Sequence, residues 1–592
     1  MDRREFLSSL ALTPLLSQVA FPARPMRRLR PGDPLWPSAG EWEKLKSAVG
    51  GRLIKLESPL AGCKQASTSA ACTNVLKSLE NPYYISDEPA YTQASGWLDA
   101  WTSAPSAYAV AAESTADVVA AVNFAREKNL RLVVKGGGHS YLGTSSSPDS
   151  LLIWTHRMNK ITMHDSFLAS GCKDAQPAVT IESGAVWQHA YNEVTTKNGR
   201  YVQGGGCATV GVAGLIQSGG FGSFSKNYGT GAAGLIEAEI VTADGKVRVV
   251  NACKEPDLFW ALKGGGGGTF GVITKVTLRT RELPQFFGGV FGNIRATSDQ
   301  AFRRLIARTM GFYQQKLLNR HWGEQIVFRP PNTMDIRMVF CDLDQKQAEE
   351  TWEPFKSWLA ESPDDFKIET PLTILAIPAR NFWDASFWGK VPMQVVRTDD
   401  RTNAPAENIY WMGDAEQPGQ FLHAYKSAWL PSSLLESRNQ QRLVDTFFEA
   451  SRYYGFSLHF NKGLAGAPAA EIEAARSTAT SPDVLDAFAL LITGSNRRAF
   501  PGVAGHEPDL TSARRSIELV GACMKAIMKV APRAGSYVSE SDFFEQDWQR
   551  SYWGSNYSRL ASIKKKYDPD GLFFVHHGVG SETWSADGFE RK

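Results

Sequence analysis

The chain has 592 residues, of which 43% are hydrophobic and 21% charged, and its formal net charge is +3. This length is too great for one hydrophobic core and predicts two or three domains. The composition excludes a disordered chain, and so mild a charge balance gives no reason to expect nucleic acid or an anionic membrane as a partner.

The first residues have the pattern of an export signal. Arg3 and Arg4 precede a short apolar run, 10–20, and then small residues and proline. A twin arginine before a run too short to span a bilayer is typical of a Tat signal. We therefore predict a signal over 1–23, cleaved after Ala20 or Ala23, a periplasmic or secreted protein, and no membrane anchor. A frayed basic tail is the alternative.

The seven cysteines are an odd number, so at least one of them does something other than pair within the chain. An exported protein can form disulfides, and we predict one between Cys63 and Cys72 because they lie close in sequence. No Cys/His cluster has the spacing of a zinc site, so no metal is predicted.

From about residue 109 the predicted elements alternate between helix and strand. Ser114 or Thr115 caps a helix that runs to about 125, and a strand at 130–134 follows. A strand at 178–182, a helix at 187–197, a hairpin of strands 236–242 and 246–250, a helix at 255–262 and a strand at 271–280 come next. Later segments include a strand at 336–341 and a helix at 512–529.

These patterns divide the chain into parts. Residues 24–108 are predicted to be a linker and N-terminal extension, and 109–283 a cofactor domain. Residues 284–535 form a second domain that builds the rest of the pocket, and 536–592 form an aromatic-rich C-terminal segment.

Four glycine-rich turns fall within the predicted cofactor domain, at 136–138, 204–206, 219–222 and 264–268. Such turns let backbone N–H groups approach a phosphate closely, and four of them favour a large ligand with a pyrophosphate. Gly266-x-Gly268-x-x-Gly271 has the Rossmann spacing, but a helix precedes it and a strand follows, which is the wrong context for NAD.

Several motifs resemble those of one known family, and they occur along the chain in the same order as in that family. They are Gly137-Gly138-His139-Ser140-Tyr141, the run from Gly204 through Cys207 to Gly214, the run from Asp257 to Thr274, and Tyr552-Trp553-Gly554-Ser555-Asn556-Tyr557. The chain resembles the berberine bridge enzyme-like branch of the vanillyl-alcohol oxidase family over roughly 100–281 and 535–575. It departs from the family at Ala208, where proline is usual, and at Lys135, where arginine is common.

The resemblance implies an α+β fold, in which a PCMH-type FAD-binding domain is built from both chain ends and an inserted substrate domain carries an antiparallel sheet. It also implies FAD joined covalently to His139 and Cys207. The remaining residues implied to hold the cofactor are Gly136, Gly137, Gly138, Ser140, Thr209, Val210, Gly211, Gly214, Gly219, Gly220, Gly271, Val272 and Asn556.

Hydride transfer from an alcohol requires a base for the hydroxyl proton. Tyr537 matches the family's base by position, and Tyr141 matches a second pocket tyrosine. Glu540 and Asp542 compete with Tyr537. If the segment is extended, alternate residues face opposite sides. Ser539 and Ser541 then lie on the same face as Tyr537, and Glu540 and Asp542 point away from it.

The resemblance therefore predicts an FAD-dependent oxidase that transfers hydride from an alcohol, either a carbohydrate, an aromatic alcohol or a simple alcohol. Val210 occupies the position that in this branch gates oxygen, and its small side chain favours O₂ as acceptor with H₂O₂ as product. The alternatives are a dehydrogenase that passes electrons to a quinone or cytochrome, and a non-catalytic binding protein with a vestigial flavin.

Overall fold

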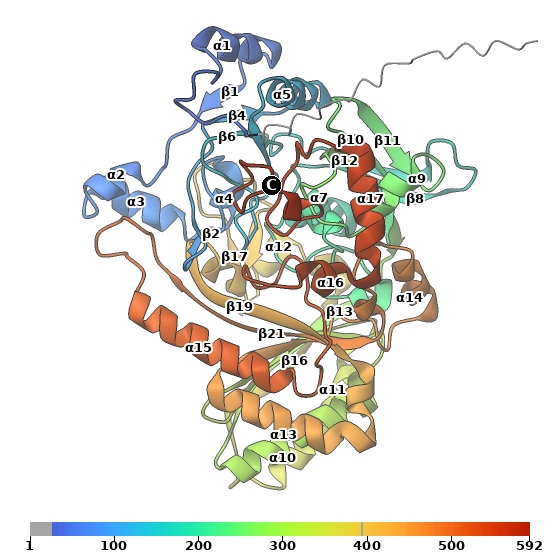
Figure 1. Ribbon diagram of the computed structural model, residues 1–592. Helices are drawn as coiled ribbons and strands as arrows, with labels where there is room; N and C mark the ends of the chain where they lie inside the picture. Colours follow the sequence, from blue (N-terminus) through green and yellow to red (C-terminus); the bar gives the residue numbers. More distant parts are fainter. Residues whose placement is uncertain (1–26, 392–394) are drawn as a thin grey trace, which may run out of the picture.

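A computed structural model describes residues 27–391 and 395–592 (Figure 1). The predicted signal over 1–23 lies outside the described residues. Three main sheets organise the fold, and two of them combine strands from segments far apart in the chain. The described part of the chain contains no helix that is long and apolar enough to cross a bilayer.

The four-stranded sheet lies next to the first predicted motif. In spatial order its strands are β1 (Leu53–Lys55), β4 (Tyr108–Ala111), β6 (Ser150–Trp154) and β5 (Arg131–Lys135). β1 is antiparallel to β4, and the other pairs are parallel. Helix α5 (Thr115–Glu127) begins at the capping box of Ser114 and Asp117 and buries Val118, Ala121 and Val122 against this sheet.

The six-stranded sheet is antiparallel throughout. Its strands are β7 (Ile161–Leu168), β8 (Ala175–Glu182), β9 (Arg200–Val202), β10 (Leu235–Val241), β11 (Val247–Asn251) and β12 (Val272–Glu282). The predicted hairpin is present, since β10 pairs with β11 and Gly245 adopts φ +75° between them. The predicted helix at 187–197 is instead α6 (Trp187–Tyr191) followed by a π-helical stretch over Asn192–Lys197.

The nine-stranded sheet is the predicted antiparallel sheet of the second domain. In spatial order its strands are β16 (Phe366–Pro378), β13 (Phe286–Ala296), β15 (Thr333–Cys341), β14 (Trp322–Arg329), β20 (Phe456–His459), β21 (Ala487–Arg498), β19 (Gln420–Pro431), β2 (Ala94–Trp97) and β3 (Trp101–Thr102). Only the β19–β2 pair is parallel. Helices α10 (Asp299–Phe312), α11 (Gln345–Ala360), α13 (Ser437–Tyr453) and α15 (Leu510–Ile527) lie together beside this sheet (Figure 1).

The alternation of side chains along β19 divides this sheet into two faces. Ala428 and Leu430 join the core that the four helices complete, whereas Trp429 packs in a separate cluster with Tyr537. Tyr425, four residues before Trp429, packs against that second cluster. The face away from the helices therefore carries the aromatic side chains toward the C-terminal segment.

The N-terminal extension contributes more than a linker. It supplies β1 to the four-stranded sheet and β2 and β3 to the nine-stranded sheet, so the large sheet is not confined to 284–535. Arg27 pairs with Glu590, and the buried Arg28 lies over the Trp584 ring. Leu132 of β5 pairs with Phe573, so the C-terminal segment returns to the cofactor domain as the resemblance implies.

The remaining helices and strands are shorter or lie at the edges of the sheets. They are α1 (Ala39–Ala48), α2 (Ala61–Gln65), α3 (Ala70–Ser78), α4 (Tyr83–Asp87), α7 (Val212–Gln217), α8 (Ser225–Tyr228), α9 (Pro256–Leu262), α12 (Ala385–Trp388), α14 (Ala469–Arg476), α16 (Trp548–Trp553), α17 (Tyr557–Tyr567), β17 (Val396–Thr398) and β18 (Ile409–Trp411).

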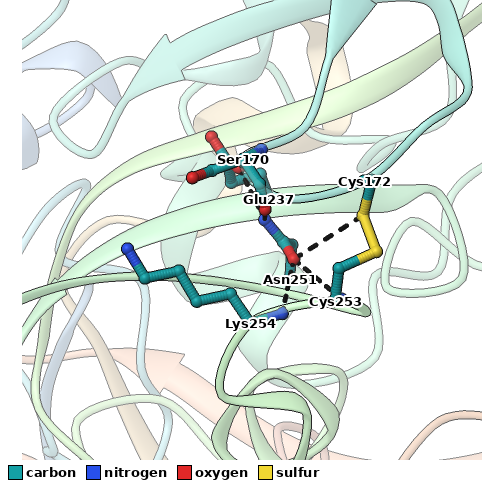
Figure 2. The surroundings of a disulfide bond; sticks show 6 residues. All are labelled: Ser170, Cys172, Glu237, Asn251, Cys253 and Lys254. Carbon is teal, nitrogen blue, oxygen red and sulfur yellow. Dashed lines mark hydrogen bonds between the residues drawn. A yellow bond between two sulfur atoms is a disulfide. The ribbon is translucent and has the colours of Figure 1, made fainter.

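Two disulfides are present. Cys63 and Cys72 are joined with their Cα atoms 4.8 Å apart, which confirms the predicted pair. A second bond, which the sequence did not indicate, joins Cys172 to Cys253 across 81 residues. Figure 2 shows it beside Asn251, whose side-chain oxygen accepts from the N–H groups of Cys253 and Lys254 at 2.8 Å each.

Candidate active site

A cavity of about 290 Å³ brings together the segments that carry the sequence motifs. Most of its lining comes from stretches 132–145, 207–218, 266–273, 537–540 and 573–578. These stretches come from the beginning, the middle and the end of the cofactor domain and from the C-terminal segment. The motifs that are scattered along the sequence therefore meet around one volume.

The loops that carry His139 and Cys207 touch each other. A Cβ atom on Gly137 would lie 2.6 Å from the Gly211 nitrogen and 2.9 Å from the Thr209 carbonyl oxygen. A Cβ on Gly211 would in turn lie 2.8 Å from the Gly137 nitrogen. Only glycine permits this approach on both sides, so the two loops are held in one register.

His139 is held from the second loop. Its Nε2 lies 2.8 Å from Oγ1 of Thr209. Burial, and then the charge of Lys135, lower the pKa of His139 to about 4, so the imidazole is neutral at pH 7. Because Thr209 engages Nε2, Nδ1 is the nitrogen that remains for a ligand.

Lys135 explains one departure from the family pattern. It is buried, and its ammonium donates to the carbonyl oxygens of Ile85, Glu88 and Tyr91 at 2.7, 2.7 and 2.6 Å. Three short bonds match the three donors of an ammonium group. The side chain thus ties the start of the His139 loop to the N-terminal extension.

Cys207 lies half-buried in the cavity lining and forms no disulfide. The Gln417 side-chain amide donates to its sulfur at 3.4 Å, and burial raises the pKa of its thiol well above the ordinary range. The loop is fixed on both sides of the cysteine. The Trp411 indole donates to the Gly206 carbonyl at 3.1 Å, and Ala208 N–H donates to the Asp414 carboxylate at 3.0 Å.

Aromatic rings and one ion pair form the wall next to these loops. The rings of Tyr141 and Tyr425 are 4.8 Å apart, and the Tyr537 ring packs edge-on against Phe221 at 5.1 Å. Burial raises the pKa of Tyr537 above its ordinary value, which keeps its hydroxyl protonated. Lys462 lines the same wall and pairs with Glu540.

The segment at Tyr537 is a turn, which corrects the geometric argument based on an extended chain. Glu540 N–H donates to the Tyr537 carbonyl at 2.9 Å, closing the turn, and residues 537–540 all line the cavity. Glu540 therefore does not point away from the site, as strand alternation predicted. Asp542 does lie outside the lining, where it pairs with Lys426.

Only two of the four glycine-rich turns expose their glycines to the cavity. Gly136–Gly138 and Gly266–Gly268 line it, but the turns at 204–206 and 219–222 pack against protein. A Cβ on Gly204 would lie 2.1 Å from the Trp187 ring, and one on Gly222 would lie 1.7 Å from the Gly204 carbonyl oxygen. In these two turns, glycine is required by close packing, so the inference that all four bare their backbones to a phosphate was wrong.

The other predicted contact residues fall into two groups. Ser140, Val210, Gly211, Gly214 and Gly271 line the cavity, whereas Thr209, Gly219, Gly220, Val272 and Asn556 do not. Thr209 acts through His139, and Val272 is buried in the core beneath α5. Asn556 donates to the Thr480 carbonyl at 2.8 Å, and a Cβ on Gly219 would meet the Thr480 side chain.

The cavity fits an elongated polar ligand such as FAD. Within the described residues, Ser183 Oγ, Gln217 Oε1 and Thr269 Oγ1 are buried without a hydrogen-bond partner, and all three residues line the cavity. Buried polar atoms of this kind require partners, which a dinucleotide supplies along its length. A Cβ on Gly214 would meet no atom within 4 Å, so the backbone there is open to a ligand.

Four residues at the site were not predicted from the sequence, namely Gln93, Asp414, Gln417 and Lys462. Gln93, Gln417 and Lys462 line the cavity, and Asp414 lies behind Cys207. Gln93 belongs to the N-terminal extension, and the other three to the segment that has no recognisable motif. No local pattern marks them, because only the pairing of distant strands brings them to the site.

Comparisons with known proteins agree with this arrangement. The family described as "FAD binding domain" matches residues 105–251, and the family described as "Berberine and berberine like" matches 536–580. FAD-linked oxidoreductase easE of Arthroderma otae is 31% identical over 601 residues, covering 96% of this chain and 92% of that protein.

Two solved structures share the fold. The VAO-type flavoprotein MtVAO615 from Myceliophthora thermophila C1 is 24% identical with a TM-score of 0.77, covering 95% of this chain and 99% of that one. Glucooligosaccharide oxidase from Acremonium strictum is 20% identical with a TM-score of 0.61, covering 80% of this chain and 92% of that one. The chain therefore belongs to the FAD-linked oxidoreductases, with an FAD binding domain and a berberine-like C-terminal segment, and it shares the fold of the VAO-type flavoproteins.

Proposed function

We propose that the protein is an exported oxidase that transfers hydride from an alcohol to FAD, and that FAD is joined covalently to both His139 and Cys207. The observation that carries the proposal is the contact between the two loops, which places a neutral imidazole and a thiol at the cavity wall beside Tyr141 and Tyr537. When bound there, FAD supplies the hydride acceptor.

Both attachment residues suit nucleophilic bonding to a ring. Nδ1 of His139 keeps its lone pair when Nε2 donates to Thr209, and the sulfur of Cys207 is fixed by Gln417. The Acremonium strictum oxidase carries a "6-s-cysteinyl, 8 alpha-N1-histidyl FAD". That pair of linkages supports the same two positions for this chain, at His139 and Cys207.

The proton of the substrate hydroxyl needs an acceptor within the same wall. Glu540 lines the cavity and pairs with Lys462. Tyr537 is a weaker candidate because burial raises its pKa, so its hydroxyl is better suited to donating a hydrogen bond. We therefore assign proton acceptance to Glu540 and orientation of the substrate hydroxyl to Tyr537 and Tyr141.

The aromatic wall favours a substrate with a flat or ring-shaped face. Tyr141, Tyr425 and Tyr537 offer such surfaces, which stack on sugars and aromatic rings. A carbohydrate or an aromatic alcohol is therefore the substrate class that we propose. Val210 supports dioxygen as the acceptor, because its small side chain lines the cavity beside Gly211.

Two features of the chain support export, the twin arginine and the disulfides. The twin arginine at the start of the chain matches a Tat signal, and the two disulfides suit an oxidising compartment. Replacing Arg3 and Arg4 with lysine and fractionating the cells tests the route. Normal amounts in the periplasm or medium would contradict export through Tat.

The activity is tested by mixing the protein with carbohydrates and aromatic alcohols while following flavin bleaching and peroxide. A substrate that bleaches the flavin without peroxide in air, followed by slow reoxidation, would favour the dehydrogenase alternative. If no alcohol or sugar bleaches the flavin, the binding-protein alternative stands instead.

The base is tested by stopped-flow flavin reduction in Glu540→Gln, Tyr537→Phe and the neighbouring control Ser539→Ala. Loss of a general base typically slows reduction by roughly 10²–10⁴-fold, and we expect this only for Glu540→Gln. Tyr537→Phe should have a smaller effect with an unchanged flavin spectrum. Reduction of Glu540→Gln at the native rate would overturn this assignment.

A further inference from the structure

Asp414 is a buried carboxylate placed behind the half-buried cysteine. It belongs to the short 3-10 helix over Met412–Glu416 and is 3% exposed. Oδ2 accepts from Ala208 N–H at 3.0 Å, and Oδ1 accepts from the Gln417 amide at 3.4 Å. Cys207 directly precedes Ala208 in the chain, and its sulfur accepts from the same Gln417 amide at 3.4 Å.

None of these partners is a cation, which makes the position costly for a carboxylate. Burying a charge without a compensating charge is unfavourable, and burial raises the pKa of Asp414 to about 6 despite the bond from Ala208. An asparagine would accept from Ala208 N–H equally well without this cost. Holding the loop alone therefore does not explain why an acid stands here.

The side-chain amide of Gln417 contacts both Cys207 and Asp414. Its side-chain nitrogen lies 3.4 Å from the Cys207 sulfur and 3.4 Å from Asp414 Oδ1, so one amide bridges nucleophile and carboxylate. The sulfur, the amide and the carboxylate therefore form one connected group beside the Cys207 loop. Such a triad of nucleophile, orienting group and proton acceptor is the arrangement that activates a weak nucleophile.

We propose that Asp414 is the general base for flavin attachment at Cys207, and that Gln417 is the positioning residue that aims the sulfur. The inference rests on the proposed attachment and goes beyond it by assigning how the bond forms. The S–H bond of Cys207 and the C–H bond at ring carbon 6 break, and the S–C bond forms. The thiol proton goes to Asp414, and dioxygen accepts the electron pair and two protons as hydrogen peroxide.

The step depends on the ionisation of Asp414, and the groups that face it come from three segments. They are the Cys207 thiol in its loop, Glu324 of β14, and Tyr83 of α4. Glu324 is half-buried, and its charge opposes ionisation of Asp414. Attachment in the native protein should therefore speed up as pH rises through about 6 and then level off.

The experiment compares the native protein with Asp414→Asn, Trp411→Phe and Cys207→Ser, each purified with its flavin. Asp414→Asn keeps the acceptor for Ala208 N–H, whereas Trp411→Phe removes the indole bond to the same loop and leaves the carboxylate in place. Peptide mass spectrometry measures the flavin on Cys207 and on His139 separately. Alkylation after unfolding counts the Cys207 thiols that remain free.

We expect Asp414→Asn to lose most of the flavin on Cys207 and to keep it on His139, as Cys207→Ser does, while Trp411→Phe keeps both. In flavin-free protein reloaded with FAD in air, attachment in Asp414→Asn should speed up about tenfold per pH unit, because it then depends on free thiolate. Native occupancy of Cys207 in Asp414→Asn overturns the inference alone, and so does an equal loss in Trp411→Phe. Absence of flavin from Cys207 in the native protein overturns the proposed attachment as well.

Discussion

The contact between the loops that carry His139 and Cys207 can be tested with one added carbon atom. Gly137→Ala places a Cβ 2.6 Å from the Gly211 nitrogen, and ordinary contacts begin at about 3.4 Å. The loops must separate by about 0.8 Å to remove this overlap, and both sides are backbone, which cannot rotate away as a side chain can. Overpacking of this kind typically costs about 1–3 kcal/mol of folding free energy.

The functional effect should be larger than the loss of stability. A misplacement of about 1 Å in a reacting geometry costs roughly 10²-fold in rate, and here it displaces His139 relative to Cys207. We therefore expect Gly137→Ala to form both flavin linkages about 10²-fold more slowly. Flavin-free protein mixed with FAD gives the rate by peptide mass spectrometry, and urea unfolding gives the free-energy change.

Gly136→Ala is the matched comparison, one residue earlier in the same loop. Its Cβ would lie 3.1 Å from a single carbonyl oxygen, that of Ser183, so a shift of a few tenths of an ångström suffices. Its effect on both measurements should be clearly smaller. Gly137→Ala with native rates, or Gly136→Ala as the more damaging change, would refute the argument that this contact sets the register of the loops.

Three further outcomes follow from contacts at and around the site. Thr209→Val removes the hydroxyl that lies 2.8 Å from His139 Nε2, so the amount of flavin on His139 should decrease while flavin on Cys207 remains. Peptide mass spectrometry measures both amounts. Unchanged flavin on His139 would contradict the role given to Thr209. In flavin-free protein the folded pKa of His139, about 4, lies below the unfolded value of 6.5, so its contribution to stability is present above pH 6.5 and is lost as pH falls toward 4. Urea unfolding should show a loss of about 2–3 kcal/mol over that range that is missing in His139→Asn; equal pH profiles would contradict it. Replacing Cys172 and Cys253 by serine removes a crosslink across 81 residues, and we expect the free energy of unfolding to fall by about 2–4 kcal/mol. An unchanged urea midpoint would contradict a stabilising role for this disulfide.

The residues nearest the predicted flavin could be identified from sequence because their signals are local. Gly136, Gly137 and His139 follow directly from the end of β5, and backbone approach dictates their residue types. Val272 and Asn556 lie in equally recognisable motifs, yet one supports the core and the other anchors Thr480. A motif therefore identified the family and its fold but did not separate contact residues from supporting ones.

The rest of the site depends on long-range pairing. Gln93 precedes β2, which pairs with β19 more than 300 residues later, and Gln417 lies just before β19. Their side chains meet at 3.0 Å only because those two strands are neighbours. The turn at Tyr537 had no glycine or proline signal, so alternation along a strand was assumed and Glu540 was placed on the wrong side.

The pairing of the first described residues with the last ones imposes an order on assembly. Arg28 is 2% exposed beneath the Trp584 ring, and its N–H donates to the Phe589 carbonyl at 2.8 Å. During synthesis, residues 27–29 can contact Asn129 and Leu130 early, but the contacts with Trp584, Phe589 and Glu590 form only after residues 584–590 have left the exit tunnel. Residues 27 and 28 are therefore fixed in place in part by contacts that form late in synthesis.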